Sequence, residues 1–291
     1  MGNNFHSINA KIGVLRKGIL KQSDYDKILS FEQRHEIVDY LKNNILYKYE
    51  IPMYEEKSMR NRYDTEFMIN KIEAELLEKL KFFLFGDDKK IIEAMLMKYE
   101  FKDIKIILRS IVENEKIDLE RDTIMYKKNK HIDYSKLVNC ENFNQALDVL
   151  KGTIYKKAIA SLTDEDIFRL HFHVEMKLDS LYFLTMKNAI DKLSKSSQAI
   201  FNDYFSTLID TINLQWIIRA KKYYDLPNEE IYSYSLRYGK YIKGDFLKDL
   251  IYSDSVEAIV EKIKKTKLRH TLEDANGNTI VSNRNINEYV Y

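Results

Sequence analysis

The chain has 291 residues, and 47 lysines and arginines against 45 acidic residues leave a net charge of +2. This balance lacks the basic excess that neutralises a phosphate backbone, so it argues against nucleic-acid binding. The sequence contains 2 prolines and 8 glycines, too few for the turns of an all-β protein. We therefore expect an all-α fold of one to three domains.

Three further features of the composition limit the class of protein. Cys140 is the single cysteine, which excludes an internal disulfide framework and a thiolate-rich metal site and suits a reducing cytosol. Charged residues interrupt every apolar stretch, so we expect no segment that spans a bilayer. The sequence Met1–Ser7 shows neither the pattern of a signal peptide nor that of a myristoylation site, and we expect neither.

The first helices are expected between residues 8 and 49. Apolar residues at positions 8, 12, 15 and 19 follow helical spacing and predict an amphipathic helix over 8–20. A short helical cluster follows to about Tyr49. Pro52 disfavours helical backbone in the residue before it, so we place a connection there.

Two pairs of long helices are expected next. Apolar residues keep helical spacing over 64–85, Gly86 supplies a stop signal, and a second helix is expected over 89–113. These two should form an antiparallel hairpin. The same plan returns with a helix that begins near Thr163 and reaches about 193, followed by one over 197–224.

The remaining sequence predicts one short helix and a loop. Pro227, followed by two acidic residues, is typical of a helix start. The stretch 274–287 is polar and rich in asparagine, with a turn signal at Asn276 and Gly277, and predicts a loop.

The most informative pattern is a set of three phrases that occurs three times. The first phrase is an apolar helical run closed by arginine: Ala10–Arg16, Asp103–Arg109 and Asn213–Arg219. The second is Asp24–Leu29, Asp133–Val138 and Asp245–Leu250, and the third is His35–Leu41, Asn144–Leu150 and Glu257–Ile263, each followed by a short end segment. Equivalent residues lie 109 and 113 apart, which is too long for a solenoid of helical hairpins. We therefore expect three units, 1–52, 53–162 and 163–291.

The repeated arginines, Arg16, Arg109 and Arg219, are interpreted as structural ties. Glu175 and Asp179 lie four apart on one helical face, where a carboxylate pair could do acid–base work or bind arginine, and Arg219 is the expected partner. By the same reasoning Glu73 or Glu75 is expected to reach Arg109. If such a pair is buried, removing one partner would cost about 3–5 kcal/mol. Asp103 and Asn213, which open the second and third copies, complete the signature set.

Enzymatic motifs are scarce. His171, His173 and Glu175 are the nearest approach to a metal cluster, but residues two apart on a helix point in different directions, which disfavours a shared metal. No glycine-rich phosphate loop and no serine or cysteine nucleophile motif occurs. The 21 tyrosines lack the basic groove that single-stranded RNA requires, so they are expected to fill helix interfaces. We predict no catalytic residue, no cofactor and no metal.

The repeated phrases resemble the C subunit of V/A-type ATPases, which is similar to the d subunit of the vacuolar enzyme. Three stretches carry the resemblance: Val174–Phe183 looks like the family's Glu-x-x-Leu-Asp-x-x-Tyr helix, Asp210–Arg219 like its Asp-x-x-Asn-Leu helix, and Leu150–Tyr155 like its Leu-x-Gly-Thr-Pro-Tyr segment with Ile154 in place of proline. The resemblance covers nearly the whole chain. The family continues into a final helix pair beyond the position of Tyr291, so one sector is expected to be absent.

The resemblance implies a fold and a role. The fold is three similar helical units around a pseudo-threefold axis, forming a funnel with long antiparallel helix hairpins. The role is that of a non-catalytic rotor subunit on the cytoplasmic face of the membrane, which couples the central stalk to the proteolipid ring for rotary proton or sodium transport without inserting into the bilayer. The resemblance leaves open the ion, the direction of ATP turnover and the residues that contact the partners.

Two other hypotheses remain open at this point. The chain could be a helical scaffold of another multiprotein assembly, which would keep the fold and lose the ATPase. It could also be a helical metal-dependent hydrolase that uses His171, His173 and Glu175.

Overall fold

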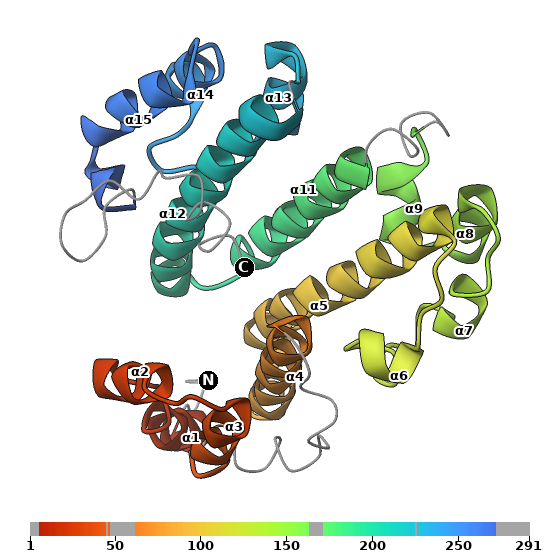
Figure 1. The fold of residues 1–291 in the computed structure, drawn as a ribbon, viewed down its shortest axis with the longest axis vertical. Coiled ribbons are helices and arrows are strands. Elements are labelled where there is room, and N and C mark those ends of the chain that lie inside the picture. Colours follow the sequence, from red (N-terminus) through yellow and green to blue (C-terminus); the bar gives the residue numbers. More distant parts are fainter. Residues whose placement is uncertain (1–5, 45, 47–61, 163–170, 225, 272–291) are drawn as a thin grey trace. The chain divides into compact units, whose positions relative to one another are not determined.

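The computed structural model describes residues 6–44, 46, 62–162, 171–224 and 226–271, and these contain helices and connecting turns but no strand (Figure 1). The all-α class is therefore confirmed. Pro52, the start of the helix expected near Thr163 and the loop expected over 274–287 lie outside the described residues.

Spatial contacts divide the chain into two compact units, Met1–Ala189 and Ile190–Tyr291. The helices of the first unit are α1 His6–Arg16, α2 Gln22–Leu29, α3 Arg34–Lys42, α4 Arg62–Lys81, α5 Gly86–Glu113, α6 Leu119–Asp122, α7 Tyr134–Leu137, α8 Phe143–Val149, α9 Ile154–Ile159 and α11 His171–Ile190. The second unit contains α12 Lys195–Arg219, the π-helix η3 Ala220–Tyr224, α13 Asn228–Tyr234, α14 Gly244–Ile251, α15 Val256–Lys264 and the 3₁₀-helix η4 Lys267–Thr271. The division into three repeats is a division by sequence pattern, and its boundaries stay a prediction.

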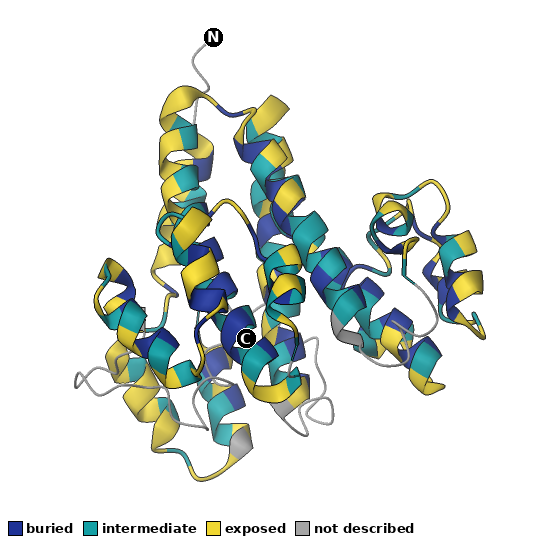
Figure 2. Ribbon diagram, turned by 90° about the horizontal axis from the view of Figure 1, so that it is seen from above, coloured by how far each residue is buried: buried dark blue, intermediate teal, exposed yellow. Residues whose placement is uncertain are grey.

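The α4–α5 hairpin of the first unit confirms the first predicted helix pair. Phe67, Ala74 and Leu77 of α4 are buried in the same apolar cluster as Ile104 and Ile107 of α5. Buried and exposed positions both occur along the long helices, as Figure 2 shows, which is the pattern of amphipathic helices. Burial of this apolar face holds the hairpin together.

The junction of this hairpin corrects one predicted detail. The sequence pattern assigned Gly86 as the stop of the first helix, but α4 ends at Lys81 and Gly86 is the first residue of α5, with a φ of +57°. A positive φ suits glycine, which has no Cβ. Asp87 and Asp88 lie in the first turn of α5, where acidic side chains stabilise the positive end of the helix dipole.

Short helices complete the core of the first unit. Leu137 at the end of α7, Leu150 directly after α8 and Ile159 at the end of α9 are 0% exposed and belong to the same cluster as α5. Leu178 of α11 is also fully buried there. The cluster thus joins the long helix α5 to α7, α8, α9 and α11, and Leu119 of α6 packs against it.

A smaller apolar cluster joins α3 to the hairpin, and Ile28 of α2 packs against it. Val38 and Leu41 of α3 are buried together with Met68 and Ile72 of α4. Figure 1 shows α1, α2 and α3 as a group of short helices beside one end of α4. Only a few apolar side chains therefore join this group to the hairpin.

The second unit repeats the arrangement of one long helix and several short ones. Ile217 of α12, Leu250 of α14 and Ile259 and Ile263 of α15 are 0% exposed and form one cluster. The helix predicted over 197–224 is observed as α12 and η3, which together end at Tyr224. Its predicted partner, observed as α11, lies in the first unit, whereas α12 lies in the second.

We expect Leu150→Ala to lower the free energy of unfolding by about 2–5 kcal/mol, because it leaves a cavity in the core of the first unit. Leu29→Ala is the matched control, since Leu29 is 82% exposed and its truncation should cost less than about 0.5 kcal/mol. Urea unfolding of both variants measures the difference. Equal losses would contradict the assigned core.

Candidate functional site

The third phrase of each copy folds into the same capped helix. Helices α3, α8 and α15 begin directly after Gln33, Asn142 and Ser255. These caps precede Leu41, Leu150 and Ile263 by the same eight residues. Asn142 and Ser255 accept the N–H group three residues later, as helix N-caps do, and Gln33 forms a reciprocal capping box with Glu36.

The end of the third phrase is also shared. A polar residue donates its backbone N–H to the apolar residue three positions earlier: Asn44 to Leu41 at 2.9 Å, Thr153 to Leu150 at 3.0 Å and Thr266 to Ile263 at 2.8 Å. The hydroxyls of Thr153 and Thr266 donate to the same carbonyl oxygens. The local structure of the three copies therefore agrees at the positions that the sequence pattern aligned.

The signature arginines end their helices in two of the three copies. Arg16 is the last residue of α1 and Arg219 is the last α-helical residue of α12, whereas α5 continues beyond Arg109 to Glu113. A cation in the last turn interacts favourably with the negative end of the helix dipole. Arg16 and Arg109 are exposed and Arg219 is half-buried, so these side chains do not form a buried site.

Asp103 of α5 holds the loop between α6 and α7. Its side chain is 0% exposed and accepts the backbone N–H groups of Ile124 at 2.9 Å and Met125 at 2.7 Å. The hydroxyl of Tyr134 donates to the same carboxylate at 3.3 Å. Burial raises the pKa of Asp103 to about 7. The three hydrogen-bond donors lower this pKa and the charge of Glu100 raises it, each by less than burial does. We call such a contact, between a polar side chain of a long helix and the loop beyond the next short α-helix, a loop clasp.

Asn213 forms the loop clasp of the second unit. It lies six residues before Arg219, as Asp103 lies six before Arg109. Its amide is fully buried, accepts the N–H of Leu236 and donates to the carbonyl of the same residue, both at 2.8 Å. The equivalence of Asp103 and Asn213, first inferred from sequence spacing, thus has a structural counterpart.

Asp210 of α12 also binds the loop between α13 and α14 that Asn213 holds. Its carboxylate accepts the N–H groups of Tyr241 and Ile242, each at 2.8 Å. Gly239 passes so close that a Cβ there would collide with Asp210 Oδ1 and with the carbonyl of Ile242. Glu100 is the residue of the second copy at the corresponding place, three before Asp103, and it accepts the hydroxyl of Tyr155. The shared three-residue spacing, Glu100 to Asp103 and Asp210 to Asn213, is the signal from which these two acids could have been predicted as site residues.

The ion pairs correct the predicted partners. Glu175 binds Arg109, and Asp179 binds Lys105 at 2.7 Å, so both carboxylates of α11 pair with α5 and not with Arg219. Glu73 pairs with Lys98 and Glu75 with Lys128, so the predicted contact of either one with Arg109 is wrong. The prediction failed because it assumed that each arginine ties its own hairpin, whereas α5 also packs against α11.

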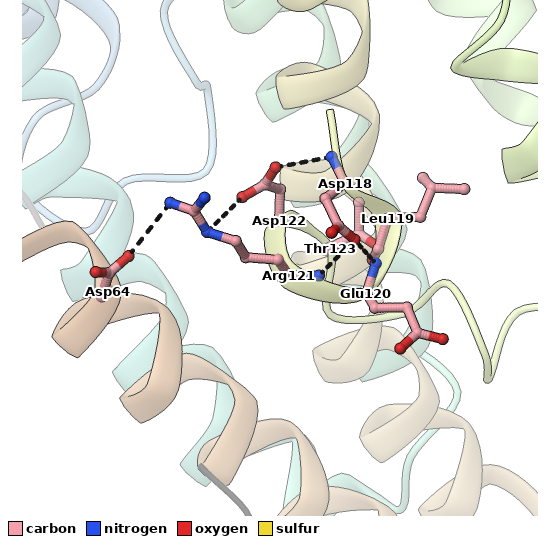
Figure 3. A network of polar contacts seen from close by, with 7 residues as sticks. All are labelled: Asp64, Asp118, Leu119, Glu120, Arg121, Asp122 and Thr123. Carbon is pink, nitrogen blue, oxygen red and sulfur yellow. Dashed lines mark hydrogen bonds and ion pairs between the residues drawn. The ribbon is translucent and has the colours of Figure 1, made fainter. Parts of the chain in front are cut away.

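A further polar network connects α6 to α4 in the first unit. Asp118 caps α6 by accepting the N–H groups of Glu120 and Arg121, and its own N–H is bound by Asp122 (Figure 3). The guanidinium of Arg121 lies between Asp122 and Asp64 of α4, at 3.7 and 3.9 Å. This helix had not been predicted, although Asp118 is a favoured N-cap residue.

The described residues offer little for catalysis near the ion pairs. The cavity beside Arg109 and Glu175 has about 10 Å³, room for no more than one water. No group of three or more metal-ligating side chains occurs in the described part of the chain, and the side chain of His171 lies outside it. Glu175, one member of the hypothetical metal set, is paired with Arg109. No helix among the described residues is long and apolar enough to cross a bilayer.

The signature residues therefore define a class of protein. Asp103, Asn213, Glu175 and Asp179 each contact other parts of the chain and hold helices or loops in place. This arrangement is typical of residues that hold a helical repeat protein together.

Comparison with known proteins gives the family. The model of the ATP synthase (C/AC39) subunit family matches residues 8–290, and the chain belongs to this family. The resemblance to the C subunit of V/A-type ATPases is thereby confirmed.

Archaeal relatives support the assignment. The C subunit of the A-type ATP synthase of Methanosarcina acetivorans is 23% identical over 231 residues, which cover 77% of this chain and 62% of that protein. For the equivalent protein of Methanobrevibacter smithii the identity is 27% over 144 residues, with 49% and 37% covered. For that of Methanothermobacter thermautotrophicus it is 20% over 268 residues, with 92% and 67% covered. The match thus spans less than two thirds of the length of the first two relatives.

We expect Gly239→Ala to lower the free energy of unfolding by about 1–3 kcal/mol, because the added Cβ displaces the Asp210 carboxylate from the loop. Gly13→Ala is the matched control. Gly13 lies inside α1 with open space at its Cβ position, so this change should stabilise the protein by about 0.5–1 kcal/mol. Thermal unfolding of both variants measures these opposite changes in stability. If Gly239→Ala left the stability unchanged, the assigned contact between Asp210 and the loop would be wrong.

We expect a small coupling between Arg109 and Glu175, because their side chains are 48% and 29% exposed and solvent screens the pair. A double-mutant cycle with alanine at each position should give about 0.2–1 kcal/mol, and 1 M salt should reduce it. The buried-pair cost of about 3–5 kcal/mol considered from the sequence does not apply to this geometry. A coupling of that size would show that the pair is shielded from water.

Proposed function

We propose that this chain is a non-catalytic rotor subunit of a V/A-type ATPase or ATP synthase, which couples the central stalk to the proteolipid ring of the membrane. The observation that carries the proposal is the family match over residues 8–290, which includes all three copies of the repeated phrases. In this role the chain binds no cofactor, lies on the cytoplasmic face of the membrane as a peripheral subunit, and contacts stalk subunits on one side and ring subunits on the other.

The internal structure suits the transmission of torque. A coupling element must not bend under load, and α4 and α5 supply helices of 20 and 28 residues that share one buried face. The loop clasps at Asp103 and Asn213 fix the loops after α6 and α13 to the long helices α5 and α12. Close packing and satisfied buried polar groups make such an interior resistant to deformation.

The proposal includes an architecture. The repeats 1–52, 53–162 and 163–291 are arranged around a pseudo-threefold axis as a funnel, and the signature residues Arg16, Arg109 and Arg219 occupy related positions in it. The matching helix caps and turns of the three copies support this arrangement, because equivalent local structure is what repeated units produce.

The alternatives are less well supported. A metal-dependent hydrolase built on His171, His173 and Glu175 requires a free carboxylate, but Glu175 is engaged by Arg109. A helical scaffold of another assembly accounts for the fold but not for the family match.

Reconstitution tests the proposal. The full chain is mixed separately with purified central-stalk subunits and with detergent-solubilised proteolipid rings, and complexes are measured by size-exclusion chromatography. We expect a complex in each case, and none with the isolated catalytic subunits as a specificity control. Absence of both complexes would contradict the rotor role and favour the scaffold, and a complex with one partner alone would contradict the coupling.

A further inference from the structure

The first helix and the turn after it carry basic residues without matching acids. In the whole chain 47 basic residues stand against 45 acidic ones, but residues 6–21 contain four basic residues and no acidic one. The four are Lys11, Arg16, Lys17 and Lys21. Lys11 is half-buried and the others are exposed, and none of the four side chains forms an ion pair within the part of the chain that the structure describes. We call residues 6–21 the basic segment.

The acids that follow the basic segment are held by other groups. Asp24 of α2 accepts the backbone N–H of Lys21 at 2.6 Å and the hydroxyl of Tyr40 of α3 at 2.5 Å. Asp26 accepts the side-chain amide of Gln22 at 2.9 Å. Of the four cations, only Lys21 lowers the pKa of Asp24 by its charge. The charges on α1 itself are therefore not balanced by the acids of α2.

The basic segment is also less buried than its counterparts in the other copies. Val14 is 45% exposed, whereas Ile107 and Ile217, which hold the same place in the other two copies, are 0% exposed. Lys11 stands where each of the other copies has a buried apolar residue. Ile19, in the turn after α1, is 59% exposed. The first copy thus leaves open, with basic and apolar side chains, a face that the other two copies close.

We propose that the basic segment binds the surface of a membrane that contains anionic phospholipids. A helix that exposes basic and apolar side chains together lies in the headgroup region, where its cations meet the phosphates and its apolar side chains lie between the headgroups. Four lysines and arginines on one short segment are typical of anionic lipid recognition. Val14 and Ile19 supply the apolar part of this contact.

The directions of the cations favour a lipid surface over an acidic protein. Lys11 and Arg16 are five residues apart on α1, so their side chains leave the helix about 140° apart. A protein partner would have to place a carboxylate opposite each of them. A layer of lipid phosphates supplies an anion wherever a long lysine or arginine side chain reaches.

Vesicle binding tests the proposal on the full chain. Flotation is measured with vesicles of phosphatidylcholine alone and with vesicles in which about one third of the lipid is phosphatidylglycerol. We expect binding to the anionic vesicles at about 0.1 M salt, release at about 1 M, and no binding to the neutral ones. Because these vesicles contain no protein, the result is independent of the reconstitution with stalk and ring, and either proposal can fail without the other.

Two double variants separate the basic segment from the general charge of the chain. Arg16→Gln with Lys17→Gln should bind the anionic vesicles roughly 30-fold more weakly, since each cation near such a surface strengthens binding about fivefold. Lys130→Gln with Lys151→Gln is the matched control, because it removes the same charge from two exposed positions elsewhere in the first unit and should bind as the natural chain does.

Two more variants separate charge from shape and apolar contact. Arg16→Lys with Lys17→Arg keeps both charges and should keep the binding, whereas Val14→Gln with Ile19→Gln keeps every charge and should weaken it. Thermal unfolding checks that each variant is folded. Absence of binding to anionic vesicles, equal binding to both kinds of vesicle, or equal losses in the glutamine variant and its control would each overturn the proposal. A chain that ignores vesicles but loses a purified stalk subunit on Arg16→Gln with Lys17→Gln would show an acidic protein to be the partner instead.

Discussion

Two loops of the described chain depend on polar side chains from inside the long helices α5 and α12. The N–H groups of a loop have no helical partner, and burying them unpaired would cost about 1–3 kcal/mol each. Asp103, Asp210 and Asn213 pair such groups from positions well before the helix end. The short helices that follow these loops contribute Leu137 and Leu250, which are both 0% exposed.

The first copy shows what happens when this residue is missing. Ala10 stands where the other copies have Asp103 and Asn213, so α1 cannot grip its own loop. The loop is held from the other side, because the Asn44 side chain donates to the carbonyl of Gly18 at 2.9 Å. The copies therefore share the same short helices and turns, but different polar residues hold their loops. For this reason the repeat is clear in the sequence at apolar and capping positions and weak elsewhere.

Much of the fold could be predicted from the sequence, and the failures have physical reasons. Helical periodicity located α1, α4, α5 and α12, and the repeat spacing located the equivalent residues Asp103 and Asn213. The partners of Glu175 and Asp179 could not be predicted, because apolar periodicity does not say which helix a face packs against. Gly86 was misread because a glycine between two helices suits the end of one as well as the start of the next. Asp210 and Glu100 were missed because only the three-residue spacing shared by the second and third copies points to them, and their partners lie in distant segments.

The polar contacts of the chain differ in how much stiffness they can give to it. Surface ion pairs such as that between Arg109 and Glu175 exchange with water and are screened by salt, so they cannot hold two helices rigidly. The clasps are buried and fully paired, and a buried hydrogen bond cannot be replaced by water without opening the packing around it. The proposed rotor role would need the second kind of contact where the long helices meet the short ones. In the first unit a second acid of α5, Glu100, adds to that contact by accepting the hydroxyl of Tyr155 of α9.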